Sequence, residues 1–369
     1  MVKTLHPLQE FDLVKKAAPV LRMLLCRIPG LIVESNEESV LQQPGLLFQP
    51  DLVFKTQLAQ GEPWSLVCEF KQHAEPRHMR LAAYEIRDRV QNNPARHIYA
   101  VLVVPYISEA AAKICEEVGI GYADLAGNAR LAFGSTFIFT HGYENPFRVR
   151  REKNLYAPKS GRVLQALLRE PRQLWKVTDL AETAQVSLGQ VSNVRRALLD
   201  REWAGLTEGR VFLKRPEELL KDWRENYKSL AATTRRAYSL LHGSDLDEAL
   251  SAAIAKAGAK HLLLASYSSA KWLAPFARVS TQYIYADSIG EQALDEVLKL
   301  EPAVKGENVI IMRPKDEGVF MGPVDGGLGL WCTSPTQTFL DLSIAGERGR
   351  EASDFLLDDY IRKRWAIES

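Results

Sequence analysis

Three charged residues mark the end of a strand-like stretch in the first half of the chain. Residues 64–71 alternate in type, so Glu69 and Lys71 fall on one face of the predicted strand. Asp51 precedes Glu69 by eighteen residues. Two carboxylates on adjacent strands can hold a hard divalent cation, and a nearby lysine can orient or deprotonate its bound water. The competing interpretation is a strand-end ion pair of Glu69 with Lys71 or with a neighbouring arginine.

The elements expected around these residues place them in one sheet. An amphipathic helix is predicted over residues 8–27, because its apolar residues recur at helical spacing. Strands are expected at 47–49, 51–54, 64–71 and 98–104, with a helix near 77–91. This order of elements, together with the motif, resembles the core of the PD-(D/E)XK nuclease superfamily.

The resemblance implies a metal-dependent nuclease site. Asp51 and Glu69 would then be ligands of Mg²⁺ or Mn²⁺, and Lys71 would position the attacking water, so that all three would be catalytic. Because such folds also serve as binding modules without chemistry, the resemblance leaves open whether the protein is an enzyme. His73 and His78 flank this site and lack metal-ligand spacing with another His or Cys, so both are interpreted as polar surface residues.

A second region, residues 160–213, has the pattern of three helices followed by a hairpin. The third helix, 187–200, begins at Ser187, which forms a capping-box pattern with Gln190. A hairpin turning at Glu208 and Gly209 follows it. The region resembles the winged helix-turn-helix domains of bacterial regulators.

This resemblance implies that the third helix enters the major groove of double-stranded DNA and that the hairpin contacts the backbone. The alternative is a winged helix used for packing or dimerisation. Net charge favours DNA, because nine basic and two acidic residues between Pro146 and Lys176 give a net charge of +7. The residues expected to contact DNA are Ser187, Gln190, Ser192, Asn193, Arg195, Arg196 and Arg210.

The last part of the chain alternates predicted helices and strands, which indicates an α/β layer. Two stretches, 313–320 and 333–352, make it resemble the AbiEi family of type IV antitoxins, together with the winged helix ahead of them. The resemblance implies a transcriptional regulator with a cognate toxin as partner. It does not require a nuclease-like N-terminal domain. Asp316, Glu317 and Asp341 are explained by turns and helix capping, with a metal-binding role as the alternative.

Composition is that of an ordinary soluble protein, with 46% hydrophobic and 25% charged residues in 369. No apolar run approaches the roughly 20 residues needed to cross a bilayer, and the first ten residues lack the apolar core of a signal peptide. Four scattered cysteines indicate neither a zinc site nor a disulfide framework. We therefore expect a cytoplasmic protein without membrane contact.

Together these observations predict an α/β multidomain protein. Its expected domains are a restriction-endonuclease-like α/β domain (1–145), a basic linker with a winged helix-turn-helix (146–225) and an AbiEi-like α/β domain (226–369). The leading functional hypothesis is a DNA-binding transcriptional regulator, with an antitoxin role included, that reads DNA with helix 187–200. The alternative is a metal-dependent DNA nuclease targeted by the winged helix. A homodimer is compatible with palindromic sites.

Overall fold

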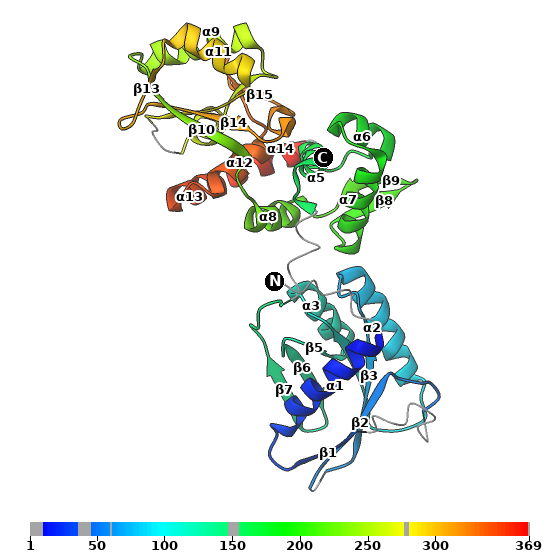
Figure 1. Ribbon diagram of the computed structural model, residues 1–369. Helices are drawn as coiled ribbons and strands as arrows, with labels where there is room; N and C mark the ends of the chain where they lie inside the picture. The colour runs from blue at the N-terminus through cyan, green and yellow to red at the C-terminus, as the bar shows by residue number, and fades with distance from the viewer. Residues whose placement is uncertain (1–9, 36–45, 60, 147–154, 277–279, 368–369) are drawn as a thin grey trace. The chain divides into compact units, whose positions relative to one another are not determined.

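The chain folds into two units that divide between residues 150 and 151. The computed structural model describes residues 10–35, 46–59, 61–146, 155–276 and 280–367 (Figure 1). Most of the predicted basic linker, 147–154, therefore lies outside the described residues. Both units combine helices with mixed β-sheets, so the expected α/β class is confirmed.

In the first unit the described strands form one sheet in sequence order. Its strands are β1 (Leu31–Ser35), β2 (Leu52–Leu58), β3 (Trp64–Phe70), β4 (Ile98–Val104), β5 (Gly121–Asp124), β6 (Ala129–Phe133) and β7 (Thr136–Thr140). Its helices are α1 (Glu10–Cys26), α2 (Pro76–Gln91) and α3 (Glu109–Val118). Strands β3, β4 and β5 are parallel and are connected through α2 and α3, whereas the other pairs are antiparallel.

The alternation predicted for residues 64–71 is confirmed, because the two faces of β3 pack against different helices. Leu66, Cys68 and Phe70 belong to the hydrophobic cluster that includes α1. Val67 belongs to the cluster formed with α2 and α3. Glu69 lies two residues after Val67, so the two side chains are on the same face of the strand, the one that α2 covers.

The second unit begins with three helices and a hairpin, which we call the helix–hairpin segment (158–213). It consists of α5 (Pro158–Arg169), α6 (Val177–Ala184), α7 (Leu188–Asp200), β8 (Ala204–Thr207) and β9 (Arg210–Leu213). Glu208 and Gly209 both have positive φ, 51° and 76°, as a two-residue hairpin turn requires. Helix α8 (Pro216–Asn226) then leads into a second sheet.

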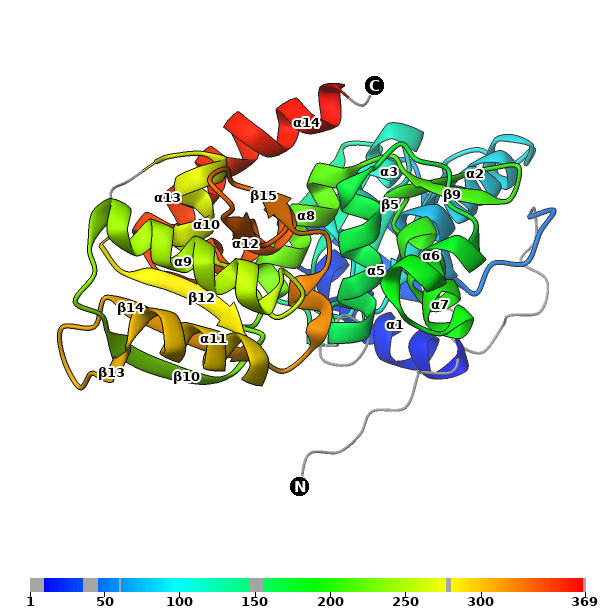
Figure 2. The same cartoon turned by 90° about the horizontal axis from the view of Figure 1, so that it is seen from above.

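That sheet has the strand order β13-β10-β14-β12-β11-β16-β15. Its strands are β10 (Ala231–Tyr238), β11 (Leu262–Leu264), β12 (Gln282–Ala286), β13 (Glu301–Pro302), β14 (Val309–Pro314), β15 (Val324–Asp325) and β16 (Trp331–Cys332). The helical elements are α9 (Gly243–Ala257), α10 (Ser266–Leu273), α11 (Ser288–Leu298), the 3-10 helix η1 (Glu317–Phe320), α12 (Pro335–Ser343), α13 (Glu347–Leu356), the π-helical turn η2 (Leu357–Ile361) and α14 (Arg362–Ile367). Helices α9 and α11 lie side by side over one face, and α10, α12 and α13 lie on the other (Figures 1 and 2).

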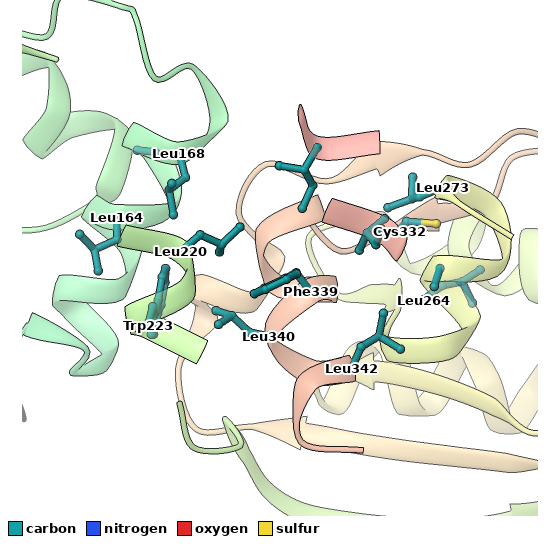
Figure 3. Packing of buried hydrophobic residues seen from close by; sticks show 14 of the residues in the cluster. Leu164, Leu168, Leu220, Trp223, Leu264, Leu273, Cys332, Phe339, Leu340 and Leu342 are labelled. Atoms are coloured by element: carbon teal, nitrogen blue, oxygen red, sulfur yellow. The ribbon is translucent and has the colours of Figure 1, made fainter. Parts of the chain in front are cut away.

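Helix α12 joins the helix–hairpin segment to this sheet. One hydrophobic core includes Leu164 of α5, Trp223 of α8, Phe339 of α12 and Leu264 of β11 (Figure 3). Phe339 is fully buried in it. The two parts of the second unit therefore share a core, and removal of Phe339 would affect both.

Replacing Phe339 with Ala should lower the free energy of unfolding of the second unit by about 3–5 kcal/mol, because it leaves a cavity at the centre of this core. Urea unfolding followed by tryptophan fluorescence would measure the loss. Ile344→Ala, an exposed apolar residue at the end of the same helix, should change the value by less than about 0.5 kcal/mol. Equal effects of the two substitutions would contradict this account of the core.

No helix of the described residues has both the length and the apolar character that a membrane crossing requires.

Candidate nucleic-acid interface and strand-end acidic site

Helix α7 presents a polar face to solvent beside the hairpin. Its buried side is formed by Val191, Val194 and Leu198. The N-cap is Ser187, whose Oγ accepts the N–H of Gln190 at 3.2 Å, as the cap pattern predicts. The solvent-exposed residues at and after this cap are Ser187, Leu188, Gly189, Ser192, Asn193 and Arg196.

Gln190 differs from the other residues predicted to face DNA. Its Nε2 donates to Oγ of Ser160 at 2.7 Å, and Ser160 is buried in the first turn of α5. The side chain is thus engaged between two helices and does not complete the reciprocal half of a capping box. Gln190 fixes the start of α7 against α5, a role that a purely local pattern does not reveal.

The arginine side chains of this surface have no partner among the described residues. Within the part of the chain that the structure describes, Arg195, Arg196 and Arg210 make no side-chain hydrogen bond or ion pair. Arg196 is exposed, whereas Arg195 and Arg210 are half-buried. Arg210 begins β9 directly after the hairpin turn. Each guanidinium therefore keeps all its donors for an anionic or polar partner.

The strand-end site in the first unit brings its three predicted residues together. Leu52 pairs with Cys68 in the β2–β3 register, so Asp51 stands opposite Glu69. Oδ2 of Asp51 accepts the N–H of Phe70 at 2.7 Å. Nζ of Lys71 donates to Oε1 of Glu69 at 2.9 Å.

The charges at this site are balanced within the protein. A nitrogen of Arg89, from α2, lies 3.6 Å from Oε1 of Glu69, next to the Lys71 contact. The ion pair that was the alternative interpretation of Glu69 is therefore formed in the structure. Burial, with a smaller contribution from the Asp51 carboxylate, raises the pKa of the Cys68 thiol well above its ordinary value, so this cysteine remains a protonated core residue.

Three other residues with metal-binding side chains converge just after this strand. Potential ligand atoms of His73, Glu75 and His78 lie within 4.8 Å of one another, the only such group of three among the described residues. The interpretation of the two histidines as separate surface residues missed this grouping. The signal that could have found it is the spacing His-x-Glu-x-x-His across the start of a helix, since residues N-cap and N3 lie close together.

A buried polar network lies at the centre of the second unit. Oδ1 of Asp341 accepts three hydrogen bonds, from the Tyr227 hydroxyl (2.7 Å), Nε2 of Gln337 (2.9 Å) and the Tyr285 hydroxyl (3.2 Å). Oδ2 is buried and has no partner among the described residues. Burial raises the pKa of Asp341 to about 7, against the lowering effect of these donors. Burial first, and then the charge of Asp341, raises the pKa of both tyrosines, so both remain hydrogen-bond donors.

The network extends to the helix–hairpin segment. Gln165 of α5 donates to Oε1 of Gln337 at 3.2 Å and accepts from the Ser334 hydroxyl at 3.1 Å. Arg162, also on α5, forms a two-point ion pair with Asp316 at 2.7 and 3.0 Å. Asp316 also accepts the N–H of Gly318, so the expected turn role is confirmed alongside this ion pair. These contacts hold α5 in one orientation against the sheet.

Asp341→Asn should make the stability of the second unit less sensitive to pH. In the wild type the folded state keeps a proton on Asp341 that the unfolded chain releases near its ordinary pKa of about 4. The free energy of unfolding should therefore fall as pH rises from about 4 to 7, by up to about 4 kcal/mol more than in Asp341→Asn. Urea unfolding at several pH values would measure this difference.

The exposed Asp245 provides a matched control, because Asp245→Asn removes the same group from solvent-accessible surface. It should retain the wild-type pH dependence. Parallel pH profiles for the wild type and Asp341→Asn would show that the buried carboxyl is not the group responsible.

Comparisons of the chain with protein-family models, with curated proteins and with solved structures find no match. A function for this protein can therefore be proposed only from its residues and their geometry.

Proposed function

We propose that the second unit binds double-stranded DNA and that the protein is a transcriptional regulator. The observation that carries the proposal is the polar face of α7, where Asn193, Arg195 and Arg196 have no side-chain partner within the described part of the protein and lie next to a hairpin. Water hydrates these donors in the free protein, and they can exchange it for contacts with phosphates and base edges. The arrangement of α5, α6, α7 and the hairpin has the element order of a winged helix-turn-helix.

The roles of the individual side chains follow from exposure. Ser192 and Asn193 are exposed near the start of α7 and can reach base edges, where an asparagine pairs with adenine. Arg196 lies one turn further on and is suited to a phosphate or a guanine. Arg210 would contact the backbone from the hairpin. Gln190 would support the orientation of the helix through Ser160 instead of contacting DNA.

The contacts of α5 with the α/β part favour a regulator over a protein that only covers DNA without sequence preference. Because α5 is bound to the sheet through Arg162–Asp316 and Gln165–Gln337, a partner of the α/β part would act on a DNA-binding surface whose orientation is fixed. A toxin of the kind that the AbiEi resemblance implies would be such a partner. An antitoxin role is therefore included in the proposal.

Arg196→Ala should weaken binding to duplexes that the wild type selects from a randomised pool by about 10-fold or more, and reduce the salt dependence by about one phosphate contact. Asn193→Ala should relax preference at one position of the selected site. Fluorescence anisotropy at several salt concentrations would measure both effects. The control is Arg348→Ala, which removes an exposed arginine from α13.

Loss of binding in Arg348→Ala equal to that in Arg196→Ala would mean that net charge, and not the α7 surface, accounts for DNA affinity. Failure of the wild type to enrich any duplex from the pool would refute sequence-specific binding.

A second candidate function, metal-dependent DNA cleavage, is favoured by the position of Asp51 opposite Glu69 with Lys71 beside it. Paired carboxylates are the donors that Mg²⁺ or Mn²⁺ takes, and Asp51 and Glu69 would hold the ion. The ion would supply Lewis-acid stabilisation of the phosphate. Lys71 would keep its ammonium near the reacting water. This candidate ranks second because Lys71 and Arg89 already balance the charge of Glu69.

Glu69→Gln should abolish any Mn²⁺-dependent cleavage of labelled duplex and single-stranded DNA, since it removes a ligand charge at nearly constant size. Glu85→Gln, at an exposed position of α2, should cleave at the wild-type rate. Products would be resolved on a denaturing gel. Intact DNA with the wild type, or cleavage that persists in Glu69→Gln, would rule out this site as the nuclease.

A further inference from the structure

Two imidazoles and one carboxylate meet at the connection between β3 and α2. Nδ1 of His78 lies 3.5 Å from Oε2 of Glu75, and Nδ1 of His73 lies 3.7 Å from the same oxygen. The two rings are tilted at 49° with centroids 5.4 Å apart. Both histidines thus have a ring nitrogen close to the same carboxylate oxygen.

The backbone that carries Glu75 and His78 is firmly placed. Glu75 is the N-cap of α2, and Pro76 occupies the first helical position. The N–H groups of His78 and Met79 donate to the Glu75 carbonyl at 2.9 and 3.0 Å. Helix α2 is anchored to the sheet by its buried residues, Met79, Ala82, Ala83 and Ile86. The backbone positions of Glu75 and His78 are thus set by the start of α2, and His73 lies in the short connection directly before it.

The two separations from Glu75 are close to those around a tetrahedral ion of the size of zinc, and the potential ligand atoms of all three residues lie within 4.8 Å of one another. Two ligand atoms about 2.0–2.1 Å from such an ion are about 3.3 Å apart. The observed separations of 3.5 and 3.7 Å exceed this by a few tenths of an ångström. The rings can move by that amount, because His73 is 50% exposed and His78 is 42% exposed.

The donor set selects the class of ion. Imidazole nitrogens suit Zn²⁺ and its neighbours Co²⁺ and Ni²⁺, whereas Mg²⁺ and Ca²⁺ take oxygen ligands in larger number. We propose that His73, Glu75 and His78 form a binding site for a divalent transition-metal ion, with Zn²⁺ as the occupant. Three protein ligands leave at least one position for water, since the site is open to solvent on the histidine side. It differs in donor chemistry from the carboxylate pair of Asp51 and Glu69, and it depends neither on DNA binding nor on cleavage.

The test is a titration of the untagged, metal-free full-length protein with Zn²⁺ by calorimetry and with Co²⁺ by visible absorption. The wild type should bind one equivalent with a tetrahedral or five-coordinate Co²⁺ spectrum. The double variant His73→Ala/His78→Ala should lose about 10- to 100-fold in affinity or more, and Glu75→Gln should lose at least about 10-fold. A large excess of Mg²⁺ should not displace Co²⁺.

Two matched controls remove exposed ligands elsewhere in the same unit, His141→Ala and Cys26→Ser. Both should bind Zn²⁺ as tightly as the wild type. Far-UV circular dichroism of each variant establishes that it is folded, and Zn²⁺ should raise the melting temperature of the first unit in the wild type and the controls only.

The proposal is overturned if the wild type binds no equivalent of Zn²⁺, or if folded His73→Ala/His78→Ala binds as tightly as the wild type. Loss of the site in Cys26→Ser or His141→Ala would likewise assign the metal to other residues.

Discussion

The burial of helix α12 is the constraint on which the second unit depends. Its residues from Thr336 to Leu342 are all buried, so it must satisfy polar side chains as well as pack apolar ones. Phe339 fills the shared core, while Gln337 and Asp341 find partners in Tyr227, Tyr285 and Gln165. Because an unsatisfied buried polar group is costly, these hydrogen bonds admit few alternative orientations of the helix–hairpin segment.

This constraint bears on function through the segment that it holds. Arg162 and Gln165 bind α5 to the sheet side of the unit, and Gln190 binds α7 to α5 through Ser160. A continuous set of contacts thus runs from the α/β core to the helix that we propose enters DNA. At the far end of this chain of contacts, Arg195, Arg196 and Arg210 have no side-chain partner in the described structure. In the first unit, by contrast, Glu69 is engaged by two cations, which favours a scaffold role over chemistry at that position.

Much of the local structure could be predicted from sequence periodicity. The two-residue period of 64–70, the helical spacing around Val191, Val194 and Leu198, and the turn at Glu208 and Gly209 all appear as expected. Strand β10 was not predicted, because its residues, Ala231–Tyr238, are mostly polar and exposed and carry no alternating pattern. Sheet neighbours on both sides, β13 and β14, make it a strand. Hydrogen bonding to these neighbouring strands overrides the weak intrinsic β-strand propensity of the segment.

The sequence by itself determined most of the helices and strands, where α7 is capped, and that Asp51, Glu69 and Lys71 share a strand end, but it missed β10 and predicted a strand at 47–49 that the structure does not contain. The sequence could not determine which helix packs on each face of a sheet, or which residue pairs with which across that packing. The pairs Arg162–Asp316 and Tyr227–Asp341 join residues 154 and 114 positions apart. Only the tertiary structure turned Gln190 towards Ser160 and buried Asp341 among three donors. The physical reason is that hydrophobic periodicity encodes the need for burial, whereas a hydrogen-bond partner is chosen by the packing of elements distant in sequence.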